Sequence, residues 1–159
     1  MRDTLIVFGA FTILSTMALV VHRASLDTTD ETLAHEANLI AITSAQQILG
    51  EVGSMNFDEH TIGRAVLAGD SILTPVDELG PEPGETVRDD VDDYNGYTEM
   101  ADSVRFPGIL LSVHVAYADP ADPTDASSVP TRMKRITVTA EDPHYLTAPI
   151  TLSSVVAWY

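Results

Sequence analysis

The chain has 159 residues, and 24 acidic residues against 8 basic ones give it a formal net charge of −16. This charge argues against nucleic acid as a partner, because phosphate binding requires a surface rich in lysine and arginine. The length leaves room for one folded domain after a long helix, but not for two. No cysteine is present, so neither a disulfide nor a cysteine-ligated metal contributes to the fold.

An uncharged, mostly apolar segment opens the chain, and residues 4–21 read TLIVFGAFTILSTMALVV. As a helix, eighteen residues would span about 27 Å, close to the hydrocarbon thickness of a bilayer. No proline occurs in residues 1–74, and no glycine lies between Gly9 and Gly50. The pattern therefore predicts one long helix over residues 1–53. Its part 4–21 suits a membrane or a filament core, and its part 22–53 is amphipathic.

The helix is expected to be continuous from about Asp3 to Leu49, with residues 10–16 as the place where it would melt locally. Thr12 and Ser15 favour this exception because their side chains compete for backbone hydrogen bonds. In the amphipathic part, an apolar stripe is predicted on one face, to be covered by a sheet from the same chain. Its members are Leu26, Leu33, Ala37, Ile40, Ser44 and Ile48.

Three interpretations of the apolar segment remain open. Residues 15–18, STMA, resemble a small-residue cleavage site, which would make the segment a signal peptide. It would otherwise be a plain membrane anchor, or a helix that lies in the membrane before assembly and in a filament core afterwards. Small residues that permit close helix–helix contact suit the last interpretation, namely Gly9, Ala10, Ser15 and Ala18.

Residues 54–159 are predicted to form an extracellular β domain. Its first part, the long loop 54–105, is interrupted by glycine and proline and is expected to hide short elements. Strand-like runs follow at residues 109–118, 132–140 and 149–159, separated by turn-rich connectors. In the second run, the inward series starts at Met133 or Lys134 and continues through Ile136, Val138 and Ala140. Consecutive strands without intervening helices favour an antiparallel meander, so the fold class is α+β, with the helix packed on the meander.

The segment 89–97, DDVDDYNGY, is the best candidate for a site. Its carboxylate and amide oxygens suit Ca²⁺, and they predict a calcium site at Asp90, Asp92, Asp93 and Asn95. The segment does not follow the EF-hand loop, because a tyrosine stands at the fifth position counted from Asp90. The alternative is a solvated acidic loop closed by an Asn-Gly turn. In both cases the loop is expected to be exposed and to be stabilised by salt or Ca²⁺.

No enzymatic function is predicted. The sequence contains no nucleophile-elbow serine, no phosphate-binding loop and no Gly-x-Gly-x-x-Gly pattern. The five histidines include no pair at metal-ligand spacing within one predicted element.

Several short strings resemble type IV pilins. Thr4-Leu5-Ile6 is similar to the start of mature pilin helices, and the segments 55–59 (MNFDE) and 89–97 resemble pilin-like proteins. The resemblance implies a structural subunit of an extracellular, cell-surface filament, held in the inner membrane before assembly and packed among identical subunits afterwards. Val7 departs from the family, which has at this position a glutamate that pairs with a neighbouring subunit's amine. A single-pass anchored binding domain and a minor pseudopilin of a secretion system are the alternatives.

Overall fold

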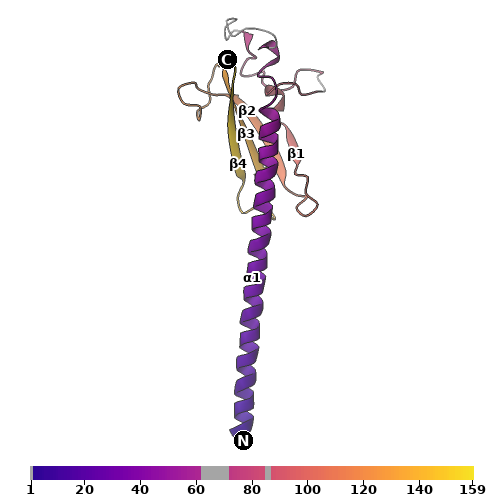
Figure 1. Ribbon diagram of the computed structural model, residues 1–159, viewed down its shortest axis with the longest axis vertical. Coiled ribbons are helices and arrows are strands. Elements are labelled where there is room, and N and C mark those ends of the chain that lie inside the picture. The colour runs from indigo at the N-terminus through magenta and orange to yellow at the C-terminus, as the bar shows by residue number, and fades with distance from the viewer. Residues whose placement is uncertain (1, 62–71, 85–86) are drawn as a thin grey trace. The chain divides into compact units, whose positions relative to one another are not determined.

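The computed structural model describes residues 2–61, 72–84 and 87–159. Helix α1, Arg2–Val52, runs for 51 residues without interruption, which confirms the predicted continuous helix (Figure 1). The expected melting at residues 10–16 does not occur. The Thr12 hydroxyl donates to the Gly9 carbonyl at 2.8 Å, and the Thr16 hydroxyl donates to the Ile13 carbonyl at 2.9 Å. Both hydroxyls therefore bond within the helix instead of breaking it.

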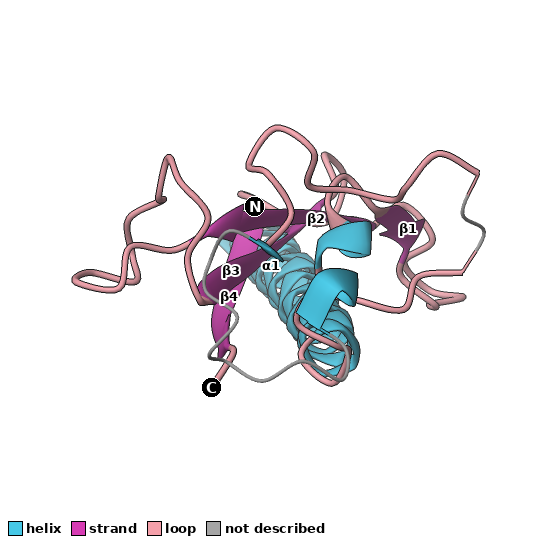
Figure 2. Cartoon of the chain, turned by 90° about the horizontal axis from the view of Figure 1, so that it is seen from above, coloured by secondary structure: helices cyan, strands magenta, loops and turns pink. Residues whose placement is uncertain are grey.

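Four strands of the described part of the chain form one antiparallel sheet in the order β1-β2-β3-β4 (Figures 1 and 2). Strand β1 is Thr98–Met100, β2 is Leu110–Tyr117, β3 is Met133–Glu141 and β4 is Ile150–Ala157. The last three match the predicted runs and confirm the α+β layout. Strand β1 was not predicted, because three residues are too few to show an alternating pattern.

Short elements do lie within residues 54–105, as expected. Two of them are the 3₁₀ helices η1, Glu59–Thr61, and η4, Asp92–Tyr94. Residues 62–71 and 85–86 of this predicted loop lie outside the described residues. Helix η4 contributes three buried side chains, so the segment contains more than surface turns.

The core lies on one face of the sheet, where inward residues of β2 and β3 stand opposite one another. The register pairs Leu111 with Ala140, Val113 with Val138, Val115 with Ile136 and Tyr117 with Lys134. All eight side chains are buried. The first three pairs are apolar, whereas the fourth places a lysine at the end of an apolar row.

The buried face of α1 differs from the predicted stripe. Its buried side chains are Ala37, Ala41, Ala45, Ile48 and Val52. Leu26 is exposed, and Ile40 and Ser44 are only half-buried. The prediction gave most weight to large apolar side chains, whereas three of the five buried side chains on this face are alanines.

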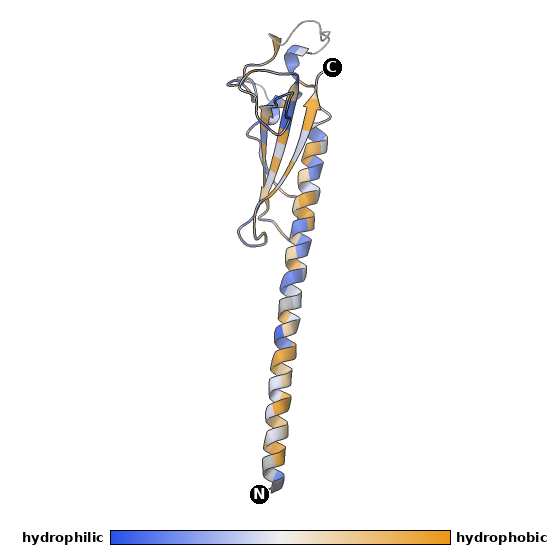
Figure 3. Ribbon diagram, turned by 90° about the vertical axis from the view of Figure 1, so that its left-hand side faces the viewer, coloured by the Kyte–Doolittle hydropathy of each residue, from blue (hydrophilic) through white to orange (hydrophobic). Residues whose placement is uncertain are grey.

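The chain divides into two compact units, 1–36 and Ala37–Tyr159, so the last part of α1 belongs to the same unit as the sheet. Apolar residues dominate the first half of α1, and polar residues alternate with them in the second half (Figure 3). An 18-residue window of α1 is long and apolar enough to cross a membrane and has no side chain buried within the chain. A signal sequence can have the same length and hydropathy.

Substitution of Gly108 by alanine is expected to lower the free energy of unfolding by about 1–3 kcal/mol, through overpacking. An added Cβ would lie 2.2 Å from Oδ2 of Asp142. That buried carboxylate cannot swing away freely, because its Oδ1 accepts the backbone N–H groups of His144 and Tyr145. Urea unfolding of the full chain in detergent measures the effect.

Gly50→Ala is the matched control, because Gly50 lies in α1 and an added Cβ there has no neighbour within 4 Å. It should stabilise the protein by up to about 1 kcal/mol through helix propensity. Equal effects at the two glycines would contradict the contact with Asp142.

Candidate functional site

Lys134 is fully buried, at 0 % exposure, near the start of β3. The alternation of β3 places it on the inward face with Ile136, Val138 and Ala140, and its strand partner is Tyr117. A charged side chain in such a position requires partners, because transferring an unpaired ammonium from water into an apolar interior is very costly.

The Lys134 amine has three oxygen acceptors. Nζ donates to the Phe57 carbonyl at 2.7 Å and to Oδ2 of Asp58 at 3.3 Å, and it is hydrogen-bonded to Oδ1 of Asp92. The ring centroids of Phe57 and Tyr117 lie 4.7 and 5.4 Å from Nζ. The three donor positions of the ammonium are thus all used, with aromatic rings beside it.

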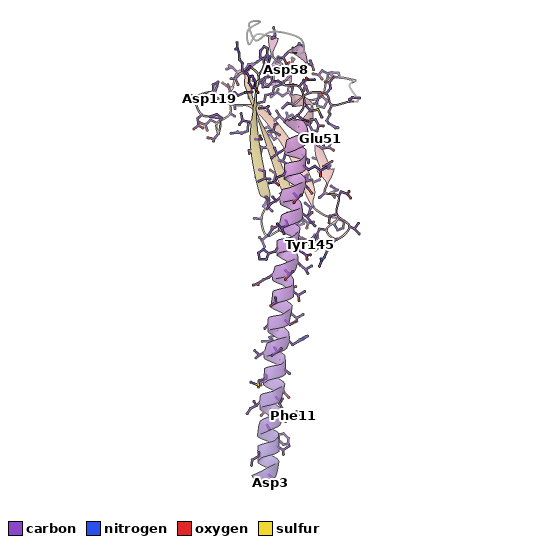
Figure 4. All side chains as sticks on the ribbon, viewed as in Figure 1. Asp3, Phe11, Glu51, Asp58, Asp119 and Tyr145 are labelled. Atoms are coloured by element: carbon purple, nitrogen blue, oxygen red, sulfur yellow. The ribbon has the colours of Figure 1, made fainter. Side chains whose placement is uncertain are left out.

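Asp58 lies just beyond the end of α1 (Figure 4) and is also fully buried. Its Oδ1 accepts the backbone N–H of His60, and its Oδ2 accepts that of Thr74, each at 3.0 Å. Burial by itself would raise the pKa of Asp58. The N–H donors and the charge on Lys134 outweigh burial and hold the pKa of this carboxyl below its ordinary value of 3.8.

Two further buried aspartates hold their own chain segment in place. Asp90 accepts the N–H groups of Asp92 and Asp93 on Oδ1, at 2.9 and 3.2 Å, and that of Glu59 on Oδ2 at 2.7 Å. Oδ2 of Asp93 accepts the N–H groups of Asp89 and Asp90. The repeated aspartates therefore satisfy the backbone of the tight turn around η4. We refer to Asp58, Asp90, Asp92, Asp93 and Lys134 together as the Lys134 cluster.

Asp90 differs electrostatically from Asp58. Burial raises the pKa of Asp90 to about 8, and the charge of the nearby Asp92 adds to the effect. The cluster contains four buried carboxyl groups and one lysine, so retaining a proton on Asp90 reduces the repulsion among the carboxylates.

The predicted exposed acidic loop is wrong for three of its aspartates. Asp90, Asp92 and Asp93 are 1, 0 and 2 % exposed, whereas Asp89 is exposed. The prediction considered only charges near in sequence. The compensating groups are backbone N–H donors of the same turn and Lys134, which is 42 residues beyond Asp92.

The predicted calcium ligands do not surround a common point. Asn95 bonds elsewhere: its Oδ1 accepts the Val115 N–H at 3.1 Å, and its Nδ2 donates to the Leu79 carbonyl. Within residues 2–61, 72–84 and 87–159, no group of three or more His, Asp or Glu side chains is arranged to hold a metal ion. The structure thus does not identify these residues as metal ligands, and the calcium site stays a prediction.

A tyrosine ties η4 to the end of α1. The Tyr94 hydroxyl donates to Oε1 of Glu51 at 2.7 Å, and burial together with this carboxylate raises the pKa of Tyr94 to about 12. The guanidinium of Arg88 lies 4.3 Å from the centroid of the neighbouring Tyr97 ring. The bond between Tyr94 and Glu51 joins η4, which carries Asp92 and Asp93 of the Lys134 cluster, to the end of α1.

Lys134 and Asp58 were not among the predicted site residues. A signal for Lys134 was present, because it occupies an inward position in the alternation of β3. Asp58 carries no such signal, since it follows a helix end within an irregular segment and two of its partners, Thr74 and Lys134, are 16 and 76 residues away.

Because the pKa of Asp90 is raised, we expect the free energy of unfolding to depend on pH while Lys134 and Asp92 form an ion pair. The unfolded chain releases this proton near the ordinary value of 3.8, and the folded chain near pH 8. The stabilising contribution is thus full below the first value and is lost as the pH rises towards the second. Unfolding free energy should decline from pH 4 to 8, and less steeply in Asp90→Asn.

Urea titrations of the full chain at several pH values from 4 to 8 measure how the free energy of unfolding changes with pH in wild type and in Asp90→Asn. Both proteins contain the same five histidines, so the contribution of histidine is the same in the two slopes. Asp89→Asn removes one exposed carboxylate from the same segment and serves as the control. Identical slopes in wild type and Asp90→Asn would show that Asp90 does not retain a proton.

Comparison of the chain with known protein families, curated proteins and solved structures finds no match.

Proposed function

We propose that this chain is a structural subunit of an extracellular filament of the type IV pilus kind, assembled by bundling of its N-terminal helices. The observation that carries the proposal is the apolar surface of α1. Large side chains such as Phe8, Phe11 and Leu14 are 73, 69 and 66 % exposed in the single chain. An apolar surface of this extent calls for a membrane or a protein partner.

Two features support identical helices as that partner. Helix α1 runs without a break from the apolar segment into the unit that contains the sheet. The apolar segment is therefore part of the same helix as residues 37–52. Small residues at positions 9, 10, 15 and 18 allow close helix–helix contact. Burial of apolar area between copies would stabilise the assembly by about 25 cal/mol per Å².

The rival function is a membrane-anchored exported domain that binds a partner and does not polymerise. Val7 favours it, because an apolar residue there cannot make the charged docking contact that the pilin resemblance implies. A minor pseudopilin would combine an anchor with limited assembly.

Electron microscopy of material sheared from cells, with mass spectrometry of the mature N-terminus, tests the proposal. Filaments containing this chain with residues 4–21 retained would support it. A monomeric protein that retains the segment would favour the anchored domain. A mature protein beginning near Leu19 would identify a signal peptide and overturn both.

A further inference from the structure

The Lys134 cluster holds an amine against a carboxyl group in a closed environment. Lys134 and Asp92 are both 0 % exposed, and Nζ contacts Oδ1 of Asp92. Oδ2 of Asp92 is buried and has no hydrogen-bond partner among the described residues. Aromatic rings of Phe57 and Tyr117 lie beside the amine. A primary amine and a carboxyl group held in this way are the two components of an amide bond.

Burial favours this reaction in two ways. Fixing two reacting groups in contact gives effective molarities of about 10⁵–10⁸ M in well-oriented cases. Removing the ion pair from water also destabilises the charged forms relative to the neutral amine and acid that react. An amide carries no formal charge, so the product avoids the cost of keeping this pair ionised in the interior.

We propose that Lys134 and Asp92 join in an intramolecular isopeptide bond. The ion pair first transfers one proton from Nζ to the Asp92 carboxylate. The neutral amine then attacks Cγ, a C–N bond forms, and the C–O bond breaks. The leaving hydroxyl takes a proton and departs as one water molecule, while the nitrogen gives up one proton, so no oxidant or other reactant is needed.

The neighbouring aspartates have distinct positions in this step. Asp58 holds the amine through Oδ2, which lies 3.3 Å from Nζ. Asp90 is held beside Asp92, whose backbone N–H it accepts on Oδ1 at 2.9 Å, and its raised pKa leaves it a proton to exchange with the reacting groups. Asp58 and Asp90 are thus the residues that orient the amine and carry the proton.

Asp92 is favoured over Asp58 as the bonded carboxyl. Both oxygens of Asp58 accept backbone N–H groups, and the pKa of this carboxyl is lowered, so it stays a carboxylate with a poor leaving oxygen. Asp92 has an unpartnered oxygen and a proton-bearing neighbour. The bond would join η4 to β3 in a chain without cysteine and close a loop of more than 40 residues, constraining the unfolded state as a disulfide does.

Intact mass spectrometry of the full chain, extracted in detergent and then denatured, tests the proposal independently of filament assembly. The expected mass is lower than the mass of its sequence by one water molecule. Trypsin should then release a branched peptide joining residues 89–105 to residues 133–135, since trypsin does not cleave after an acylated lysine. A full sequence mass would overturn the proposal.

A succinimide at an aspartate also loses one water, so the position of the loss is decisive. Water lost within residues 89–105 alone, without the branched peptide, would likewise overturn the isopeptide bond. Asp92→Ala and Lys134→Arg should each show the full mass of their own sequence. Asp119→Ala, which removes an exposed carboxylate, should keep the loss. The wild-type mass decides the question even where a cluster variant fails to fold.

Discussion

In the ion-paired form of the chain, in which Lys134 keeps its free amine, Asp58→Ala is expected to lower the free energy of unfolding by about 3–5 kcal/mol, the range seen when one partner of a buried ion pair is removed. The substitution takes one acceptor from Lys134 and leaves the backbone N–H of Thr74 without its partner. Each loss exposes a buried polar group to an environment that cannot solvate it. Urea unfolding of the full chain in detergent, followed by circular dichroism, measures the change.

Asp119→Ala is the matched control. Asp119 accepts the Ala121 N–H at 2.8 Å but lies on an exposed loop (Figure 4), so its removal should cost less than about 1 kcal/mol. The contribution of Asp58 should also fade in acid. Because its folded pKa is lowered, this stabilisation is present above the ordinary value of 3.8 and is lost as the pH falls through the folded value. A cost at Asp58 no greater than at Asp119 would show that the cluster does not support the fold.

Leu19→Glu is expected to abolish filament assembly while leaving the sheet unit folded. The proposed function buries Leu19 among identical helices, and an unpaired charge in such a dry interface costs several kcal/mol for every subunit. Ser15→Lys should act in the same way with the opposite charge. Electron microscopy of sheared material measures assembly, and near-ultraviolet circular dichroism of the extracted protein measures folding.

Val129→Glu is the control for Leu19→Glu, because the two side chains are similarly exposed in the single chain, 60 % against 57 %. Val129 lies in the sheet unit, outside the proposed helix bundle. Filaments formed normally by Leu19→Glu would refute bundling through this face. Loss of filaments in both variants would point to a general effect of added acidic charge.

The long helix could be predicted because its signal is local. Without proline and with glycine only near its ends, nothing in residues 10–49 breaks a helix. The phase of its buried face could not be predicted as well, since the deciding residues are Ala37, Ala41 and Ala45. Alanine carries little hydrophobic signal, and its place in the core depends on how closely the sheet approaches.

The candidate site shows where sequence reasoning ends. The closely spaced carboxylate and amide side chains of residues 90–95 predicted a site, but they predicted it on an exposed loop. Lys134, the charged partner of Asp92, comes from strand β3, and no local pattern links the two residues. Tertiary pairing decided between a solvated loop and a buried cluster, and it also placed Asn95 in different hydrogen bonds.

The wide sequence separation within the Lys134 cluster has a consequence for the order of folding. Lys134 meets Asp92 across 42 positions and Asp58 across 76. Closing such distances carries a high entropic cost, so we expect β2 and β3 to pair before the cluster closes. Until then the amine remains hydrated, and its dehydration accompanies the docking of residues 57–60 and 89–94. Complete removal of water from Lys134 would therefore mark arrival at the native state.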